Sequence, residues 1–357
     1  MKYIISKIPV IFLIVIFSTS NSFSCTTFCI KKENNMVFGR NFDFSTGYGH
    51  VIINKRNVLK KAMVRQDEKQ MQWISKFGNI TFNQAGRELP YGGINEAGLV
   101  IEQMWLDGTQ YPEIDDRFGL TELQWIQYQL DNSESVDDVI ASDSIVRVSV
   151  NSIAPLHFLV CDKNGSIATI EYIGGKMKCH KDDSLPYSVL ANHSYRESID
   201  YTRRFHDFGG KDTLANTTGS LDRFAIAASM INKIDNQENL IDYSFDILKA
   251  VNQKGATHWS IVYDVTNMKV YYRTLKNQSF RSFDLKDFDF SCKSPDLYLD
   301  IEESMNNNKL EFKLYSYESN RKLIEDVCNN VQFLESMPAE ARDRMAGYPE
   351  TTECKEE

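Results

Sequence analysis

From Cys25 to Leu106 the pattern of apolar and polar positions is typical of β-strands. β-Branched and aromatic residues fill Cys25–Ile30, the segment Glu33–Asn35 predicts a turn, and Met36–Arg40 returns as a second strand. Three further strands are expected over His50–Asn54, Asn79–Asn83 and Leu99–Leu106.

Apolar residues then change to helical spacing. They recur every three or four positions over Leu120–Leu130, which predicts a helix, and similar spacing after Ser133 predicts a second, shorter helix. Two more amphipathic helices are predicted over Leu221–Ile234 and Leu240–Val251.

Strands return in the second half of the chain. Short polar turns predict two hairpins, one joining His157–Cys161 to Ile167–Tyr172 and one joining His258–Asp264 to Met268–Thr274. A single strand is expected over Ser188–Asn192. Because strands and helices come in groups rather than in strict alternation, the order favours a layered α+β domain.

The end of the chain differs in composition from the rest. From Glu302 the residues are mostly polar, with one further strand expected over Leu310–Tyr317. Asn320–Glu357 is charged and has a helical pattern, and its final residues are expected to fray. We therefore expect one domain over residues 25–318 and a charged helical tail over 319–357.

The segment Met1–Ser24 has the composition of a secretory signal peptide. Two lysines precede the apolar run Ile8–Phe17, which is too short to span a bilayer comfortably, and small residues precede a cut before Cys25. We expect a secreted or periplasmic protein whose mature chain begins with Cys25. A lipoprotein signal is also cut before a cysteine, although Ser22 stands where an aliphatic residue is usual.

Composition narrows the possible partners. The chain of 357 residues is 42% hydrophobic and carries a net charge of −9, which is typical of a globular protein. An acidic chain has no general attraction to phosphate backbones, so we expect no nucleic-acid partner. Once the leader is removed we expect no membrane partner either.

Cys25 is the residue with the most informative chemistry. At the start of a mature chain it carries both a thiol and an α-amine, whose pKa near 8 leaves a fraction unprotonated at neutral pH. Such an amine can take the thiol proton without a separate histidine or lysine. Arg40 and Asp43 lie in the returning strand, where a hairpin can bring them beside Cys25, although a surface ion pair is the usual role of such residues.

Six motifs together resemble the choloylglycine hydrolase and penicillin V acylase family of linear-amide hydrolases. They occur in the family's order from Cys25 to about Thr274. The resemblance implies a four-layer αββα sandwich of the N-terminal nucleophile type, without metal or cofactor. The motifs are Cys25–Phe28, Phe38–Asp43, Gly93–Leu99, Val189–Asn192, Asp222–Phe224 and Thr257–Asp264.

The resemblance also implies roles for individual residues. Cys25 would be the nucleophile and, through its amine, the base, while Asp43 would hydrogen-bond that amine. Arg40 and Arg223 would flank the thiol and the developing charge. The side-chain N–H of Asn192 would donate to the oxyanion. Without the resemblance, Asn192 would be interpreted as a turn residue at a strand end and Arg223 as a charge on a helix surface.

Trp105 marks a departure from the family. The second oxyanion donor of bile salt hydrolases is the backbone N–H of a residue that is commonly asparagine, and Trp105 stands at that position here. A backbone donor survives a change of side chain, and the indole is expected either to reshape the acyl pocket or to be a plain core aromatic. The stretch from Asn192 to Arg223 is shorter than the assembly loop of Gram-positive members, so a homo-oligomer is possible but its geometry is not predicted.

The sequence thus predicts a secreted N-terminal-cysteine amidohydrolase that acts on a small-molecule N-acyl amide of the conjugated bile salt or penicillin V type. The alternatives are an N-acyl-homoserine-lactone or ceramidase-like acylase on the same fold, and a lipid-anchored binding protein without catalysis. The six histidines show no metal-binding spacing, and disulfide pairing among the later cysteines cannot be predicted.

Overall fold

The computed structural model describes residues 25–215, 217–306 and 309–355. The predicted signal segment Met1–Ser24 lies outside the described residues. Within the described ranges, no helix has the length and apolar character needed to cross a membrane.

A six-stranded sheet carries the start of the chain. Its antiparallel centre is the hairpin of β1 (Thr26–Lys32) and β2 (Asn35–Asp43), in which Thr27 pairs with Arg40 and Phe28 with Gly39. The strand β15 (Thr257–Asp264) lies on the other side of β2. The ring of Phe28 crosses Gly39 so closely that a Cβ there would lie 2.3 Å from it, which explains the glycine before Arg40. In spatial order the strands are β14 (Val189–Leu190), β1 (Thr26–Lys32), β2 (Asn35–Asp43), β15 (Thr257–Asp264), β16 (Lys269–Thr274) and β17 (Arg281–Asp284).

A nine-stranded sheet forms the second layer. In spatial order its strands are β13 (Lys176–Lys181), β12 (Ile167–Ile173), β11 (Leu156–Cys161), β8 (Val100–Trp105), β7 (Gly92–Asn95), β6 (Asn79–Asn83), β3 (His50–Asn54), β18 (Leu297–Asp300) and β19 (Lys313–Leu314). Two small sheets flank it: β9 (Phe118–Leu120) with β10 (Val146–Val148), and β20 (Glu353–Cys354) with β4 (Val58–Lys61) and β5 (Gln72–Ile74).

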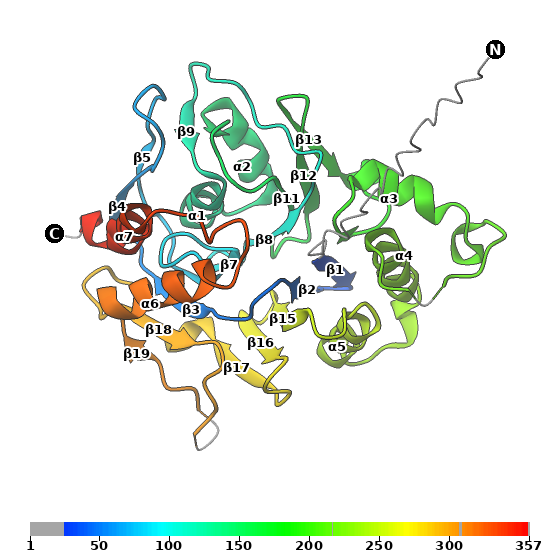
Figure 1. The fold of residues 1–357 in the computed structure, drawn as a ribbon. Coiled ribbons are helices and arrows are strands. Elements are labelled where there is room, and N and C mark those ends of the chain that lie inside the picture. The colour runs from blue at the N-terminus through cyan, green and yellow to red at the C-terminus, as the bar shows by residue number, and fades with distance from the viewer. Residues whose placement is uncertain (1–24, 216, 307–308, 356–357) are drawn as a thin grey trace, which may run out of the picture.

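Helices cover the outer faces of both sheets (Figure 1). Against the six-stranded sheet lie α4 (Ser220–Ile231) and α5 (Leu240–Ala250), preceded by α3 (Tyr195–Thr202). Against the nine-stranded sheet lie α1 (Glu122–Asn132) and α2 (Val136–Ala141), and their apolar residues share a core with that sheet. The layers therefore run helix, sheet, sheet, helix, which confirms the predicted α+β sandwich.

Two predicted elements differ from the structure for local reasons. The helix predicted from Leu120 begins at Glu122, because the Thr121 side chain accepts a hydrogen bond from the Gln124 N–H and caps it. The strand predicted over Leu310–Tyr317 is wrong except at Lys313–Leu314. Ser316 and Ser319 form a reciprocal capping pair there and start a helix instead.

The C-terminal segment has regular secondary structure as far as Cys354. It consists of α6 (Tyr317–Cys328), a turn-rich loop and α7 (Ala339–Gly347). The expectation that the last residues fray is wrong for Glu353–Cys354, because these residues pair with β4 and Cys354 forms a disulfide with Cys292. Figure 1 shows α6 beside β3 and β18 and α7 beside β4, on the side of the molecule away from α4 and α5.

Candidate active site

Cys25 lies immediately before β1, on the face that points between the two sheets. Since side chains alternate along a strand, the pairing of Thr27 with Arg40 places Cys25 on the same face as Arg40 and Phe42. Only 6% of Cys25 is exposed. The hairpin therefore brings Arg40 beside Cys25, as predicted.

Arg40 is buried between the two sheets, and residues on the side of the nine-stranded sheet bind its guanidinium. It forms an ion pair with Glu102 of β8 and donates to the Tyr91 carbonyl at 3.2 Å. Among the described residues, its Nε and Nη2 atoms have no oxygen or nitrogen acceptor, and the guanidinium lies beside the Cys25 sulfur. Burial raises the pKa of the Cys25 thiol, and the Arg40 charge acts in the opposite direction.

Asp43 lies at the end of β2 next to Cys25. The Cys25 thiol donates to the Asp43 carbonyl oxygen at 3.8 Å. The Asp43 carboxylate accepts from the Thr257 hydroxyl and, at 3.1 Å, from the Gln253 amide. Burial raises the pKa of Asp43 to about 6, with the Arg223 guanidinium acting to lower it.

Arg223 joins the parts of the site. It lies in the first turn of α4, and its Nη1 donates to the Cys25 carbonyl at 2.8 Å and lies 3.7 Å from the Asp43 carboxylate. Its Nη2 donates to the Asn192 side-chain oxygen at 3.3 Å. Arg223 thus contacts the backbone of Cys25 rather than its sulfur.

Asn192 lies two residues beyond β14 and is fixed on several sides. Its backbone N–H donates to the Ser220 hydroxyl at 2.8 Å, and its side-chain nitrogen donates to the Trp105 carbonyl at 2.8 Å.

The backbone N–H and C=O of Trp105 point to the side of β8 on which Asn192 lies. The Leu106 N–H donates to the Pro155 carbonyl at 2.9 Å, so Leu106 faces β11 and its neighbour Trp105 faces away. The N–H and C=O of one strand residue point to the same side, so the Trp105 N–H points to the side from which Asn192 approaches. The Trp105 indole is partly exposed and packs against Phe333, with 5.8 Å between the two ring centroids.

The structure therefore brings all six predicted residues into one connected set. Arg40 and Asp43 flank Cys25, Arg223 links Cys25 to Asn192, and Asn192 is bonded to Trp105. The roles that the resemblance implies for these residues stay predictions. The six are Cys25, Arg40, Asp43, Trp105, Asn192 and Arg223.

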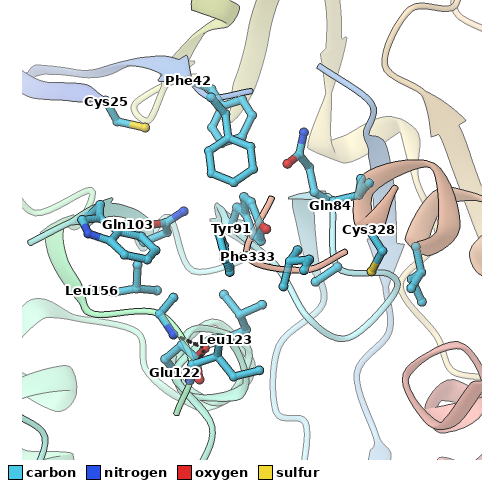
Figure 2. Close-up of a pocket in the computed structure, with 18 of the residues that line it drawn as sticks. Cys25, Phe42, Gln84, Tyr91, Gln103, Glu122, Leu123, Leu156, Cys328 and Phe333 are labelled. Atoms are coloured by element: carbon cyan, nitrogen blue, oxygen red, sulfur yellow. Dashed lines mark hydrogen bonds between the residues drawn. The ribbon is translucent and has the colours of Figure 1, made fainter. Parts of the chain in front are cut away.

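A mostly apolar pocket opens beside Cys25 (Figure 2). Its cavity volume is about 110 Å³, with Cys25 at one end and Phe333 and Cys328 across from it. The Trp105 indole lines it, so of the two roles expected for that side chain the structure favours the pocket. Its other lining residues include Phe42, Phe44, Tyr91, Leu123, Leu156, Leu334, Met337 and Met345.

Several supporting residues were not predicted from the sequence. Glu102 holds Arg40. The His157 Nε2 donates at 2.7 Å to the carbonyl of Ala191, next to Asn192, and the Glu171 carboxylate lies 3.3 Å from the His157 Nδ1. In the sequence, the only indication of these residues was a polar side chain within an otherwise apolar strand. Nothing in the sequence indicated that the C-terminal segment contributes to the pocket.

The remaining cysteines give no second site. Cys292 pairs with Cys354, and Cys29, Cys161, Cys179 and Cys328 are free thiols. Across the described ranges, no group of three or more histidine, cysteine or acidic side chains is placed to hold a metal ion.

Comparison with known proteins identifies the family. Residues 25–298 match the linear amide C–N hydrolases of the choloylglycine hydrolase family, and the chain belongs to this family of enzymes. A penicillin V acylase of Pectobacterium atrosepticum is 24% identical over 263 residues, which cover 62% of this chain and 69% of that protein. A bile salt hydrolase/transferase of Lactiplantibacillus plantarum is 27% identical over 307 residues, covering 73% and 92% respectively.

Solved structures agree on the fold. A penicillin V acylase from Agrobacterium tumefaciens aligns with a TM-score of 0.70 at 24% identity, over 81% of this chain and 98% of that one. A conjugated bile acid hydrolase from Clostridium perfringens aligns with a TM-score of 0.63 at 16% identity, over 82% and 97%.

Proposed function

We propose that this chain is exported, is cut before Cys25, and hydrolyses the amide bond of a small N-acylated substrate through an acyl-enzyme on the Cys25 sulfur. The observation that carries the proposal is the position of Cys25. Its thiol lies at the end of an apolar pocket and is bordered by the connected set of Arg40, Asp43, Arg223 and Asn192.

The first half of the reaction forms a thioester. The cut turns the Cys25 nitrogen into an amine, which takes the thiol proton as the sulfur attacks the substrate carbonyl. The Asn192 side-chain N–H and the Trp105 N–H donate to the oxygen as it becomes negative. The protonated amine then gives its proton to the leaving nitrogen as the carbon–nitrogen bond breaks.

The second half releases the acid. Water attacks the thioester carbonyl, the amine accepts the water proton, and the sulfur leaves as thiolate and regains a proton. Arg40 supports the thiolate in both halves, because its positive charge and its buried N–H groups without an oxygen or nitrogen acceptor favour an anion beside them.

The pocket supports a bulky acyl group. Two similar proteins are named for penicillin V and for bile salts, whose acyl parts are an aromatic ether and a steroid. We propose that the acyl group of the substrate occupies the apolar pocket and that the leaving amine lies outside it. The site of action is the periplasm or the cell exterior, as the leader segment and the disulfide Cys292–Cys354 support.

Intact-mass measurement of the exported protein tests the proposal. We expect a mature chain that begins at unmodified Cys25 and that gains the mass of the acyl group during rapid mixing with substrate. A matched protein that keeps methionine before Cys25 has the thiol but an amide in place of the amine, and should not turn over. A lipid adduct on Cys25, or equal turnover by the blocked protein, would overturn the proposal.

A further inference from the structure

One wall of the pocket comes from outside the part of the chain that matches the family. The family match ends at residue 298, whereas seven pocket-lining residues lie between positions 324 and 345. All are apolar or cysteine. We call them the C-terminal wall: Ile324, Val327, Cys328, Phe333, Leu334, Met337 and Met345.

The segment that carries this wall is fixed at its beginning by Asn320. The Asn320 side chain accepts from the Arg87 N–H at 2.8 Å and donates to the Ala346 carbonyl at 3.0 Å. Gly86 allows this approach, because a Cβ at that position would lie within 3.0 Å of Ile324 and Asn320. This contact joins α6 to α7 and to the loop after β6.

The segment is also fixed at its end. The Tyr348 hydroxyl donates to the Lys61 carbonyl at 2.8 Å, β20 pairs with β4, and the disulfide of Cys354 with Cys292 closes the connection. The wall therefore lies between two anchored ends and is not a free extension.

Arg342 holds the loop between the two helices. It is 9% exposed, and its guanidinium donates to the carbonyls of Met337 and Glu335 at 3.1 and 3.0 Å and to the Asn329 side chain at 2.9 Å. The loop presents Phe333, Leu334 and Met337 to the pocket in the conformation that these bonds fix.

We propose that the C-terminal wall determines which acyl groups the enzyme accepts, and that it selects long, apolar acyl chains that extend from Cys25 to α6 and the loop after it. The inference rests on the proposed function, in which the acyl group fills this pocket. Short acyl groups end before the wall and gain nothing from it. Longer chains bury apolar surface against its aliphatic, thioether and aromatic side chains.

A series of N-acylglycines from acetyl to dodecanoyl tests this selection. In wild type we expect kcat/KM to rise with acyl length until the chain reaches the wall. Calorimetry with the Cys25→Ala protein measures binding of the same series without turnover. A flat length profile in binding would overturn the inference, whatever the turnover.

Two variants locate the effect. Phe333→Ala removes a ring that is 44% exposed and lines the pocket, and should weaken binding and kcat/KM about tenfold for long chains only. Leu334→Trp fills the pocket and should shift the preference toward shorter chains. Phe280→Ala is the control, because that ring is similarly exposed at 48% but lies outside the pocket.

The failures of the two proposals differ. Length-dependent binding that Phe333→Ala reduces and Phe280→Ala does not, in a protein without turnover, would retain the wall and reject the proposed reaction. If both Phe333→Ala and Leu334→Trp turn over substrate with an unchanged preference for acyl length, the proposed reaction would stand and the proposed role of the C-terminal wall would be rejected.

Discussion

Charged and amide side chains surround one side of Cys25, and a nearly apolar cavity lies on the other. On the polar side, Arg40, Asp43 and Arg223 are fully buried and each contacts a specific partner. On the apolar side, side chains from strands, α1 and the C-terminal segment meet around open space. The polar side comes from β2, β8, the residues after β14 and the start of α4, all within the family match.

The difference shows that the two sides tolerate change unequally. A buried charge that loses its partner costs several kcal/mol, so the polar side has few acceptable sequences. An apolar wall needs only suitable volume and shape, so many sequences can build one. We therefore expect changes on the polar side to affect the reaction of every substrate and changes on the apolar side to affect the choice of substrate.

The largest effect is expected at Cys25 itself. Cys25→Ala removes the proposed nucleophile and should lower kcat by about 10⁴-fold or more, as loss of other nucleophiles does. Cys29→Ala is the matched control, since it removes a buried thiol from the same face of β1. Steady-state kinetics with any accepted substrate measures both, and turnover by Cys25→Ala near the wild-type rate would contradict the site assignment.

Asn192 should show the next largest effect. Asn192→Ala removes a donor directed at charge that develops in the transition state, so kcat should fall by about 10²–10³-fold with little change in KM. Asn192→Asp should be at least as damaging, because it places negative charge near the oxyanion. If Asn192→Ala instead lowers the melting temperature and keeps kcat, the residue is a structural turn residue.

The buried carboxyl of Asp43 predicts a pH dependence. Its pKa is raised to about 6, so above that pH it is ionised and can hold the Cys25 amine. Below pH 6 it is protonated, and kcat/KM should fall about tenfold per pH unit. Asp43→Asn should lose this acid limb, and a limb that persists at the same pH would assign it to another group.

The same raised pKa affects stability with a defined sign. The folded protein binds the Asp43 proton more tightly than the unfolded chain, whose pKa is 3.8. This contribution to the free energy of unfolding is therefore fully present below about pH 4 and is lost as the pH rises through 6. Denaturant titrations of wild type and Asp43→Asn across that range measure it by difference.

Trp105 should give the smallest effect and sharpens the comparison, because its backbone belongs to the polar side and its indole to the apolar side. Trp105→Leu keeps the N–H and removes the ring that packs on Phe333. We expect kcat to stay within about threefold while selectivity among acyl groups changes by a few-fold to tenfold. A loss of kcat as large as that of Asn192→Ala would show that the indole is needed for the reaction itself.

The parts of the fold that local patterns specify were predictable. The β1–β2 and β11–β12 hairpins and the helices α4 and α5 follow from alternation, turn residues and helical spacing. The helix α3 was missed although Ser194 and Glu197 form a capping box that the sequence displays. Strands of three residues such as β9 and β10 lack enough alternation to be recognised.

The site residues also divide into those that local patterns predict and those that they do not. Hairpin geometry alone was enough to predict that Arg40 and Asp43 lie near Cys25. In the β1–β2 pairing, both residues lie within a few positions of the point opposite Cys25. Asn192, Arg223 and Trp105 came only from the resemblance to a family, since nothing local shows that a turn, a helix and a distant strand meet. The C-terminal wall is a tertiary contact outside that family match, so neither kind of argument could find it.

The two anchors of the C-terminal segment make it a replaceable part. They bind to β4, to the loop after β6 and to Cys292, none of which belongs to the set of six site residues that includes Cys25. The helices between the anchors can therefore change in sequence or length while the reaction centre keeps its geometry. On the proposal that the C-terminal wall selects the acyl group, substrate choice could change in evolution while the cleavage reaction is kept.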